Sequence, residues 1–128
     1  MSAAHDSADH RTATLVLDDE ASARARGGPW LRARRACLSE HDGLRARLIV
    51  AELLDNARRH GLPHYVLELV LDRRAGICTI RFRDRAAERA GGWTAAAGLS
   101  IVEALSEQWG YVLLADSTTV WVKVRVEG

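Results

Sequence analysis

Two segments of the chain have an apolar residue at every second position, and this alternation limits the folds open to it. Cys78, Ile80 and Phe82 alternate with Thr79, Arg81 and Arg83, and every second residue over 120–126 is valine. Successive side chains of a strand point to opposite faces, so each segment predicts a strand with one apolar face. A sheet built from such strands needs a second layer to cover that face.

The remaining segments supply further strands and the covering helices. Strands are predicted at 12–17, 65–71, 76–84, 111–114 and 120–126, and helices from near Glu20, from Pro29 to about Glu40, over 42–60 and over 98–108. The expected fold is α+β: a two-layer α/β sandwich whose mixed, mostly antiparallel sheet carries helices on one face. Residues 1–11 are polar and are expected to form a disordered tail before a single domain over 12–128.

Length and composition exclude several classes of protein. The 128 residues suffice for one domain with a substantial core. A net charge of +1 argues against nucleic acid or an anionic membrane as a partner held by charge. No apolar run approaches the length of a membrane span, and the N-terminus lacks the apolar core of a signal peptide. We therefore expect a soluble, cytoplasmic protein.

The stretch IVAELLDNARRHG, residues 49–61, places Glu52 and Asn56 four residues apart within the long predicted helix. Residues at this spacing share a helix face. The broad apolar side of the helix is made by Ala46, Val50, Leu53, Leu54 and Ala57. Two interpretations of the pair are open. It is a solvated surface contact worth a few tenths of a kcal/mol, or a carboxylate that acts on water beside an amide that binds a metal.

Two features downstream also suggest a site. Strand parity places Asp84 in the core-facing row of Cys78, Ile80 and Phe82, where a carboxylate is costly to bury without a hydrogen-bond partner. The partner is a ligand amine or an arginine side chain. Alternatively, the carboxylate is exposed to solvent at the end of the strand. Gly98 starts a predicted helix, whose free backbone N–H groups suit an anion such as phosphate, although small residues before helices are common.

Taken in order, these segments resemble a known superfamily. The stretches AELLDNARRHG, IRFRD, GLSIVEALSEQWG and TTVWVKV look like the motifs of the GHKL ATPases, which share the Bergerat fold. The likeness is closest to the small anti-sigma-factor, serine-kinase-like ATPases of actinomycete bacteria. It spans about 15–126, and the arginine-rich, lysine-poor composition fits such an origin.

The resemblance implies a role for each residue of the predicted site. Glu52 is implied to be the general base that activates the hydroxyl or water attacking the γ-phosphate of ATP, and Asn56 to be the Mg²⁺ ligand. Asp84 is implied to accept a hydrogen bond from the adenine amino group. Gly98 and Leu99 are implied to contact phosphate through their backbone N–H groups.

Further residues complete the pocket that the resemblance implies. Thr119 stands near its end, and residues 85–97 form the ATP lid. The sequence lacks a lysine near the phosphates, and Arg58, Arg59 or Arg89 is expected to take its place. Trp93 lies within this lid. It stacks on adenine, anchors a partner, or folds back onto the core.

The sequence departs from the family pattern around the nucleotide. Ala86 stands where the motif after Asp84 has its first glycine, and three alanines, 95–97, replace glycines before Gly98. Each added Cβ narrows a loop that must follow the phosphates closely.

Two functions are therefore predicted. The first is an ATP-binding regulatory protein of the anti-sigma-factor and serine-protein-kinase type, which uses ATP and Mg²⁺ and controls transcription through a sigma factor or an anti-sigma antagonist protein. The alternative is a non-catalytic interaction module with a degenerate nucleotide pocket. A sensor histidine kinase fragment is disfavoured, because no phosphoacceptor helix precedes the ATPase-like part. A homodimer is expected by analogy only.

Overall fold

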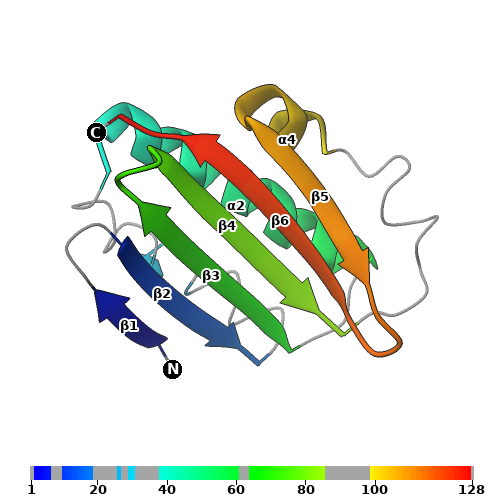
Figure 1. The fold of residues 1–128 in the computed structure, drawn as a ribbon. Coiled ribbons are helices and arrows are strands. Elements are labelled where there is room, and N and C mark those ends of the chain that lie inside the picture. The colour runs from blue at the N-terminus through cyan, green and yellow to red at the C-terminus, as the bar shows by residue number, and fades with distance from the viewer. Residues whose placement is uncertain are drawn as a thin grey trace.

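The chain folds around one antiparallel β-sheet, behind which α2 lies in Figure 1. The computed structural model describes residues 2–6, 10–18, 26, 29–30, 38–60, 64–85 and 99–127, and of 2–6, 10 and 58–60 it describes only the backbone. The elements are β1 (Ser2–Asp6), β2 (His10–Leu17), α2 (Glu40–His60), β3 (Tyr65–Asp72), β4 (Ile77–Asp84), α4 (Ser100–Leu105), β5 (Gln108–Leu113) and β6 (Thr118–Arg125). The predicted combination of helices with a largely antiparallel sheet is confirmed.

The six strands lie in the order β1-β2-β3-β4-β6-β5, and every neighbouring pair is antiparallel. β4 and β5 point the same way in Figure 1, but β6 lies between them, so they do not pair with each other. The prediction of a mixed sheet is therefore wrong for the described strands. The chain reverses direction after β5, and β6 lies antiparallel to both β4 and β5.

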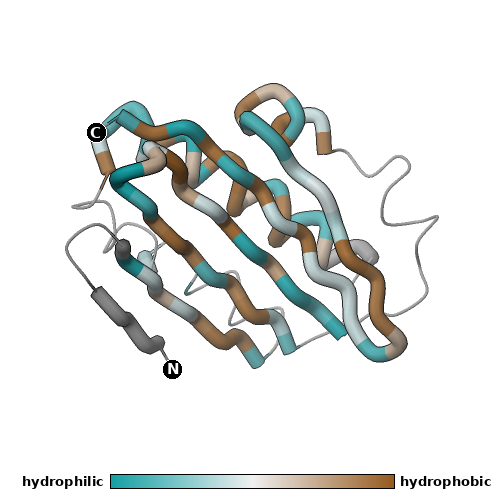
Figure 2. The backbone as a smooth tube through the Cα atoms, in the orientation of Figure 1, coloured by the Kyte–Doolittle hydropathy of each residue, from teal (hydrophilic) through white to brown (hydrophobic). Residues whose placement is uncertain are grey.

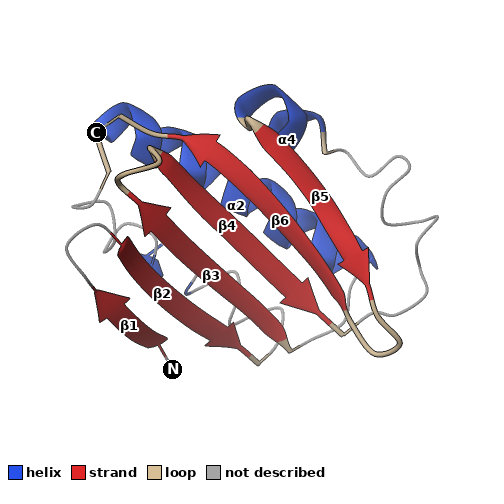
Figure 3. Cartoon of the chain, in the orientation of Figure 1, coloured by secondary structure: helices blue, strands red, loops and turns tan. Residues whose placement is uncertain are grey.

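One face of the sheet is covered by helices, which lie behind it in Figure 3. Side chains along β3 and β4 alternate between buried and more exposed positions, and Figure 2 shows the matching alternation of brown and teal along the central strands. The buried residues of α2 are Ala46, Ile49, Val50, Leu53, Asn56 and Ala57, and Asp42 and Gly43 near its start. The buried residues of β4 and β6 include Cys78, Ile80, Phe82, Val120, Val122 and Val124, which confirms the predicted apolar faces.

α4 is shorter than the sequence indicates. The prediction placed a helix over 98–108, whereas α4 ends at Leu105. Ser106 has extended backbone angles (φ −98°, ψ 155°), and the Glu107 N–H donates to the Lys123 carbonyl at 2.7 Å. Backbone pairing with β6 therefore ends the helix and leads directly into β5.

The N-terminal residues form strands where a disordered tail over 1–11 was predicted. Ser2–Asp6 is β1, which pairs with β2, and His10 and Arg11 belong to β2. The prediction rested on the polar side chains of this segment. Antiparallel pairing joins backbone groups and does not require apolar side chains, so a polar segment can cover the open edge of β2.

The helices predicted before α2 lie mostly outside the described residues. Of the segment from Glu20 to residue 37, only Arg26, Pro29 and Trp30 are described, and all three are helical. Trp30 is buried and belongs to the hydrophobic core.

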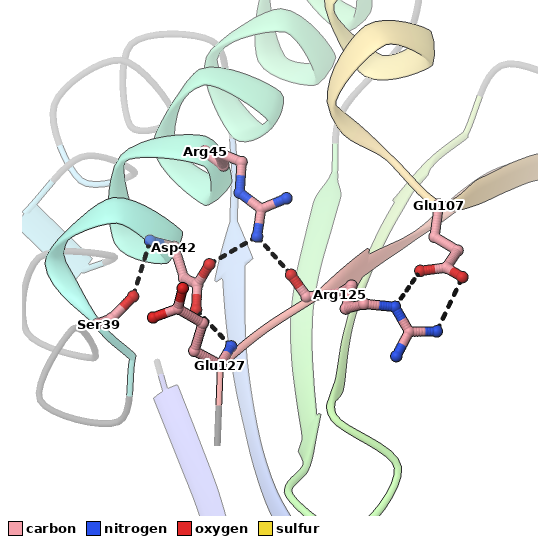
Figure 4. Close-up of polar contacts among 6 residues, drawn as sticks. All are labelled: Ser39, Asp42, Arg45, Glu107, Arg125 and Glu127. Carbon is pink, nitrogen blue, oxygen red and sulfur yellow. Dashed lines mark hydrogen bonds and ion pairs between the residues drawn. The ribbon is translucent and has the colours of Figure 1, made fainter.

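A polar cluster ties the start of α2 to the segment that follows β6 (Figure 4). The Ser39 Oγ accepts the Asp42 N–H at 3.1 Å, which caps α2 slightly before the predicted start at residue 42. The fully buried Asp42 carboxylate accepts hydrogen bonds from Arg45 at 2.6 Å and from the Glu127 N–H at 2.8 Å. Arg45 also donates to the Arg125 carbonyl. These bonds hold the helix against the end of the sheet.

Opposing effects act on the pKa of Asp42. Burial raises the pKa, but the hydrogen bonds from Glu127, Arg45 and Ser39 outweigh it and leave the pKa of Asp42 below its ordinary value. Asp42 is therefore ionised in the folded protein at neutral pH and forms a partly buried ion pair with Arg45.

Candidate functional site

Glu52 lies in the second half of α2, on the side that meets α4. Its side chain is partly buried, and its Oε2 accepts the backbone N–H of Ile101 at 3.0 Å. This N–H belongs to the first turn of α4, where backbone donors have no acceptor within the helix. The Glu52 carboxylate thus binds the start of α4 and links the two helices.

Asn56 lies one turn after Glu52, and its side chain is completely buried. Its Nδ2 donates to the Glu52 backbone carbonyl at 3.1 Å. Its Oδ1 receives no hydrogen bond in the part of the chain that the structure describes. Leaving a buried oxygen of this kind without a donor costs roughly 1–3 kcal/mol. Glu52 and Asn56 therefore do not form the solvated surface pair that their spacing allowed.

Asp84 ends β4 on the covered face of the sheet, as strand parity predicts, and its side chain is fully buried. The residue opposite it on β6 is Thr118, which is buried as well. Opposite residues of an antiparallel pair have Cβ atoms about 5 Å apart. A carboxyl and a hydroxyl group therefore lie next to each other on the covered side.

The predicted placement of Thr119 near the pocket is corrected by the strand register. Thr119 pairs with Arg83 and lies on the helix-free face, opposite to the face that carries Asp84. Thr118 is the residue that sequence reasoning missed. The signal was present, because the buried valines from Val120 onward fix the parity of β6 and place residue 118 on the covered side.

The other predicted site residues are described in part or not at all. Leu99 is buried and directly precedes α4. Arg59 belongs to the last turn of α2, but only its backbone is described. Gly98 and Trp93, with the rest of the predicted lid beyond Arg85, lie outside the described residues.

The described site residues lie on the covered face of the sheet, near the end at which β4 stops. The C-terminal half of α2 lies behind the part of the sheet in which β4 ends and β6 begins (Figure 1). α2 also contacts β4 and α4 directly. Glu52 and Asn56 are therefore on the same covered side as Asp84 and Thr118.

The residue types of this site fit a Mg²⁺ ion that is bound together with phosphates. Mg²⁺ prefers oxygen ligands, and beside a nucleotide it takes most of them from phosphate and water. The buried Asn56 Oδ1 without a donor is an oxygen of the required kind. Among the described residues, no group of three or more His, Cys, Asp or Glu side chains is placed to hold a metal by itself.

Comparisons with known proteins add no name to these observations. No protein-family model matches the chain, and a comparison with curated proteins likewise gives no match. Within the described ranges, no helix is both long and apolar enough to cross a membrane.

Proposed function

We propose that the chain is an ATP-binding regulatory protein of the GHKL type with a Bergerat fold. In this proposal Asn56 ligates Mg²⁺, Asp84 accepts a hydrogen bond from the adenine amino group, and Glu52 is the general base. Bound Mg²⁺ would neutralise charge on the phosphates. The protein would act in the cytoplasm on a protein partner, a sigma factor or an anti-sigma antagonist, as anti-sigma-factor serine kinases do.

The unsatisfied Asn56 Oδ1 is the observation that carries this proposal. A structural asparagine in a core would normally have both ends of its amide hydrogen-bonded. Here the nitrogen is bonded to the Glu52 carbonyl and the oxygen receives no bond from any described residue. A core position that retains such an oxygen at a cost in stability is typical of a functional site.

The environment of Asp84 gives further support. Asp84 is fully buried at the covered end of β4, where a carboxyl group is costly unless it is hydrogen-bonded. Asp84 and the neighbouring Thr118 offer a hydrogen-bond acceptor and a hydroxyl group to a polar ring edge. This combination suits the amino group and ring nitrogens of adenine.

Calorimetric titration with Mg·ATP and Mg·ADP tests the nucleotide site. The wild-type chain is expected to bind both nucleotides with micromolar affinity, and Asp84→Ala to bind them at least about tenfold more weakly, since it loses a hydrogen bond to a charged acceptor. Asp116→Ala is the matched control, because Asp116 is exposed in the turn between β5 and β6. No heat of binding for the wild type at millimolar nucleotide would contradict the proposal.

A second function, a non-catalytic interaction module, is favoured by two observations at the same site. The Oε2 of Glu52 accepts the Ile101 N–H, so this oxygen is engaged within the protein. Asn56 is fully enclosed, so a metal ion reaches it only if the surrounding side chains move. In this function the fold persists as a scaffold and the protein acts by binding a partner.

The formation of ADP from ATP distinguishes the two functions. Glu52→Gln keeps an oxygen that can accept the Ile101 N–H but removes the carboxylate that serves as base. A catalytic protein should lose ADP release in Glu52→Gln while its ATP affinity and melting temperature stay unchanged. A wild type that binds ATP and forms no ADP would show that the protein does not hydrolyse ATP by itself, as expected of an interaction module.

A further inference from the structure

The sheet has a second face that no described helix covers, and it faces the viewer in Figure 1 and Figure 3. We call it the open face, meaning the outward-pointing residues of β2, β3, β4, β6 and β5. Its side chains differ in exposure: Arg81 is 56% exposed and Val112 is 47% exposed, whereas Val16, Val66 and Thr119 are half-buried. A sheet face of this size that combines apolar and charged side chains is a surface on which a partner can pack.

One row of the open face crosses five strands and contains no acidic residue. Strand register places Val16, Val66, Arg83, Thr119 and Val112 side by side in that order. The neighbouring row differs, because there Arg81 pairs with Glu68 at 3.0 Å. Arg83 is exposed and has no ion pair or hydrogen bond to another described side chain. The row is thus an apolar stripe with one uncompensated positive charge at its centre.

A second copy of this chain does not suit the row. Arg83 lies on β4, which is the middle strand of the five. In a two-fold symmetric dimer built on this row, the central residue meets its own copy. Two Arg83 side chains would then face each other with no acid in the row to compensate them, which opposes association.

A nucleic acid does not suit the open face either. Sheets that bind single strands use several aromatic rings as stacking platforms. Trp121 is the one aromatic residue at the described outward positions, and its indole lies over Gly110, where a Cβ would come within 2.6 Å of it. The Lys123 ammonium lies 5.7 Å from the centroid of the same ring. The net charge of +1 adds little attraction for phosphates.

We propose that the open face binds a protein partner through a segment that combines acidic and apolar side chains. A carboxylate of the segment pairs with Arg83, and its apolar side chains contact Val16, Val66 and Val112. Charge complementarity and the apolar stripe together select this chemistry. The proposal does not rest on the nucleotide site, which lies on the opposite side of the sheet, so either can fail without the other.

Two short synthetic peptides of equal length test this surface, one alternating valine with glutamate and one alternating valine with lysine. Amide chemical shifts of the labelled protein are followed by NMR during each titration. The glutamate peptide is expected to shift amides of the row on β2, β3, β4, β6 and β5, and the lysine peptide to shift none. Arg83→Glu should weaken binding of the glutamate peptide at least about tenfold, through lost attraction and added repulsion.

Arg73→Glu is the matched control, because Arg73 is an exposed arginine in the turn between β3 and β4, away from the row. It should bind the glutamate peptide as the wild type does. Equal weakening in both variants would overturn the proposal, since only net charge would then matter. It would also be overturned if a single-stranded oligonucleotide bound the same strands more tightly, or if the same shifts arose from self-association on raising the protein concentration.

Discussion

Replacing Asp42 by alanine is expected to lower the free energy of unfolding by about 3 kcal/mol. The buried Asp42 carboxylate accepts hydrogen bonds from Arg45 and from the Glu127 backbone N–H. Its removal leaves Arg45 without its counter-charge, and the Arg45 Nε already lacks a partner among the described residues. Urea denaturation followed by tryptophan fluorescence measures the change.

Glu107→Gln is the matched control for Asp42→Ala. Glu107 forms a two-bond ion pair with Arg125, at 2.7 and 2.9 Å, close to the Asp42 cluster (Figure 4). Both of these side chains are exposed, and exposed ion pairs contribute little to stability. The control should therefore unfold nearly as the wild type does. Equal destabilisation by the two substitutions would mean that burial of Asp42 is not what matters.

The Asp42 cluster also predicts how stability depends on pH. The pKa of Asp42 in the folded protein lies below its ordinary value of 3.8. Its contribution is therefore present above that value and is lost as the pH falls through the lower folded-state pKa. The difference in stability between wild type and Asp42→Ala should be largest near neutral pH and should shrink below about pH 4. A difference that stays constant on acidification would contradict this assignment.

Replacing Asn56 by leucine is expected to stabilise the protein and to abolish nucleotide binding. Leucine has the same branched shape as asparagine and removes the buried oxygen that lacks a donor. We expect a gain of about 1 kcal/mol in the free energy of unfolding. In the presence of Mg²⁺, the affinity for ATP should fall by roughly a hundredfold or more, because the proposed metal ligand is gone. Denaturation and calorimetry on the same preparation measure both effects.

Asn56→Asp is the informative partner of this substitution. It keeps an oxygen ligand but places a second carboxylate in a buried position, which should destabilise the unliganded protein. Mg·ATP should then raise its melting temperature more than that of the wild type. An Asn56→Leu variant that loses stability, or that binds Mg·ATP unchanged, would show that Asn56 is only a packing residue.

Much of the fold follows from periodicity in the sequence. The alternation of β4 and β6 gave the correct faces, and the apolar spacing of α2 gave its contact with the sheet. The segments that were predicted wrongly are those whose structure depends on backbone pairing and not on apolar periodicity. β1 is polar and forms because the edge of β2 offers unpaired backbone groups. α4 ends early because the Glu107 N–H pairs with β6, a contact set by the sheet and not by helix propensity.

The site was predicted in part for the same reasons. Asp84 lies on the covered face, as strand parity predicts, but parity left open whether its carboxylate is buried or exposed at the end of the strand. Asn56 was grouped with Glu52 on a separate side of the helix, but it also continues the buried stripe of Ile49 and Leu53 at spacings of seven and three. The bond between Glu52 and Ile101 joins residues 49 positions apart, and local sequence carries no signal for it.

The position of β6 has a consequence for how the chain is made. β6 follows β5 in the sequence but lies between β4 and β5 in the sheet. β4 and β5 are therefore synthesised before the strand that joins them, and each has an edge without its partner until β6 inserts. The nascent chain has to be kept from aggregating during this interval. We expect chaperone dependence of its biosynthesis to be greatest in that interval and to end when β6 inserts.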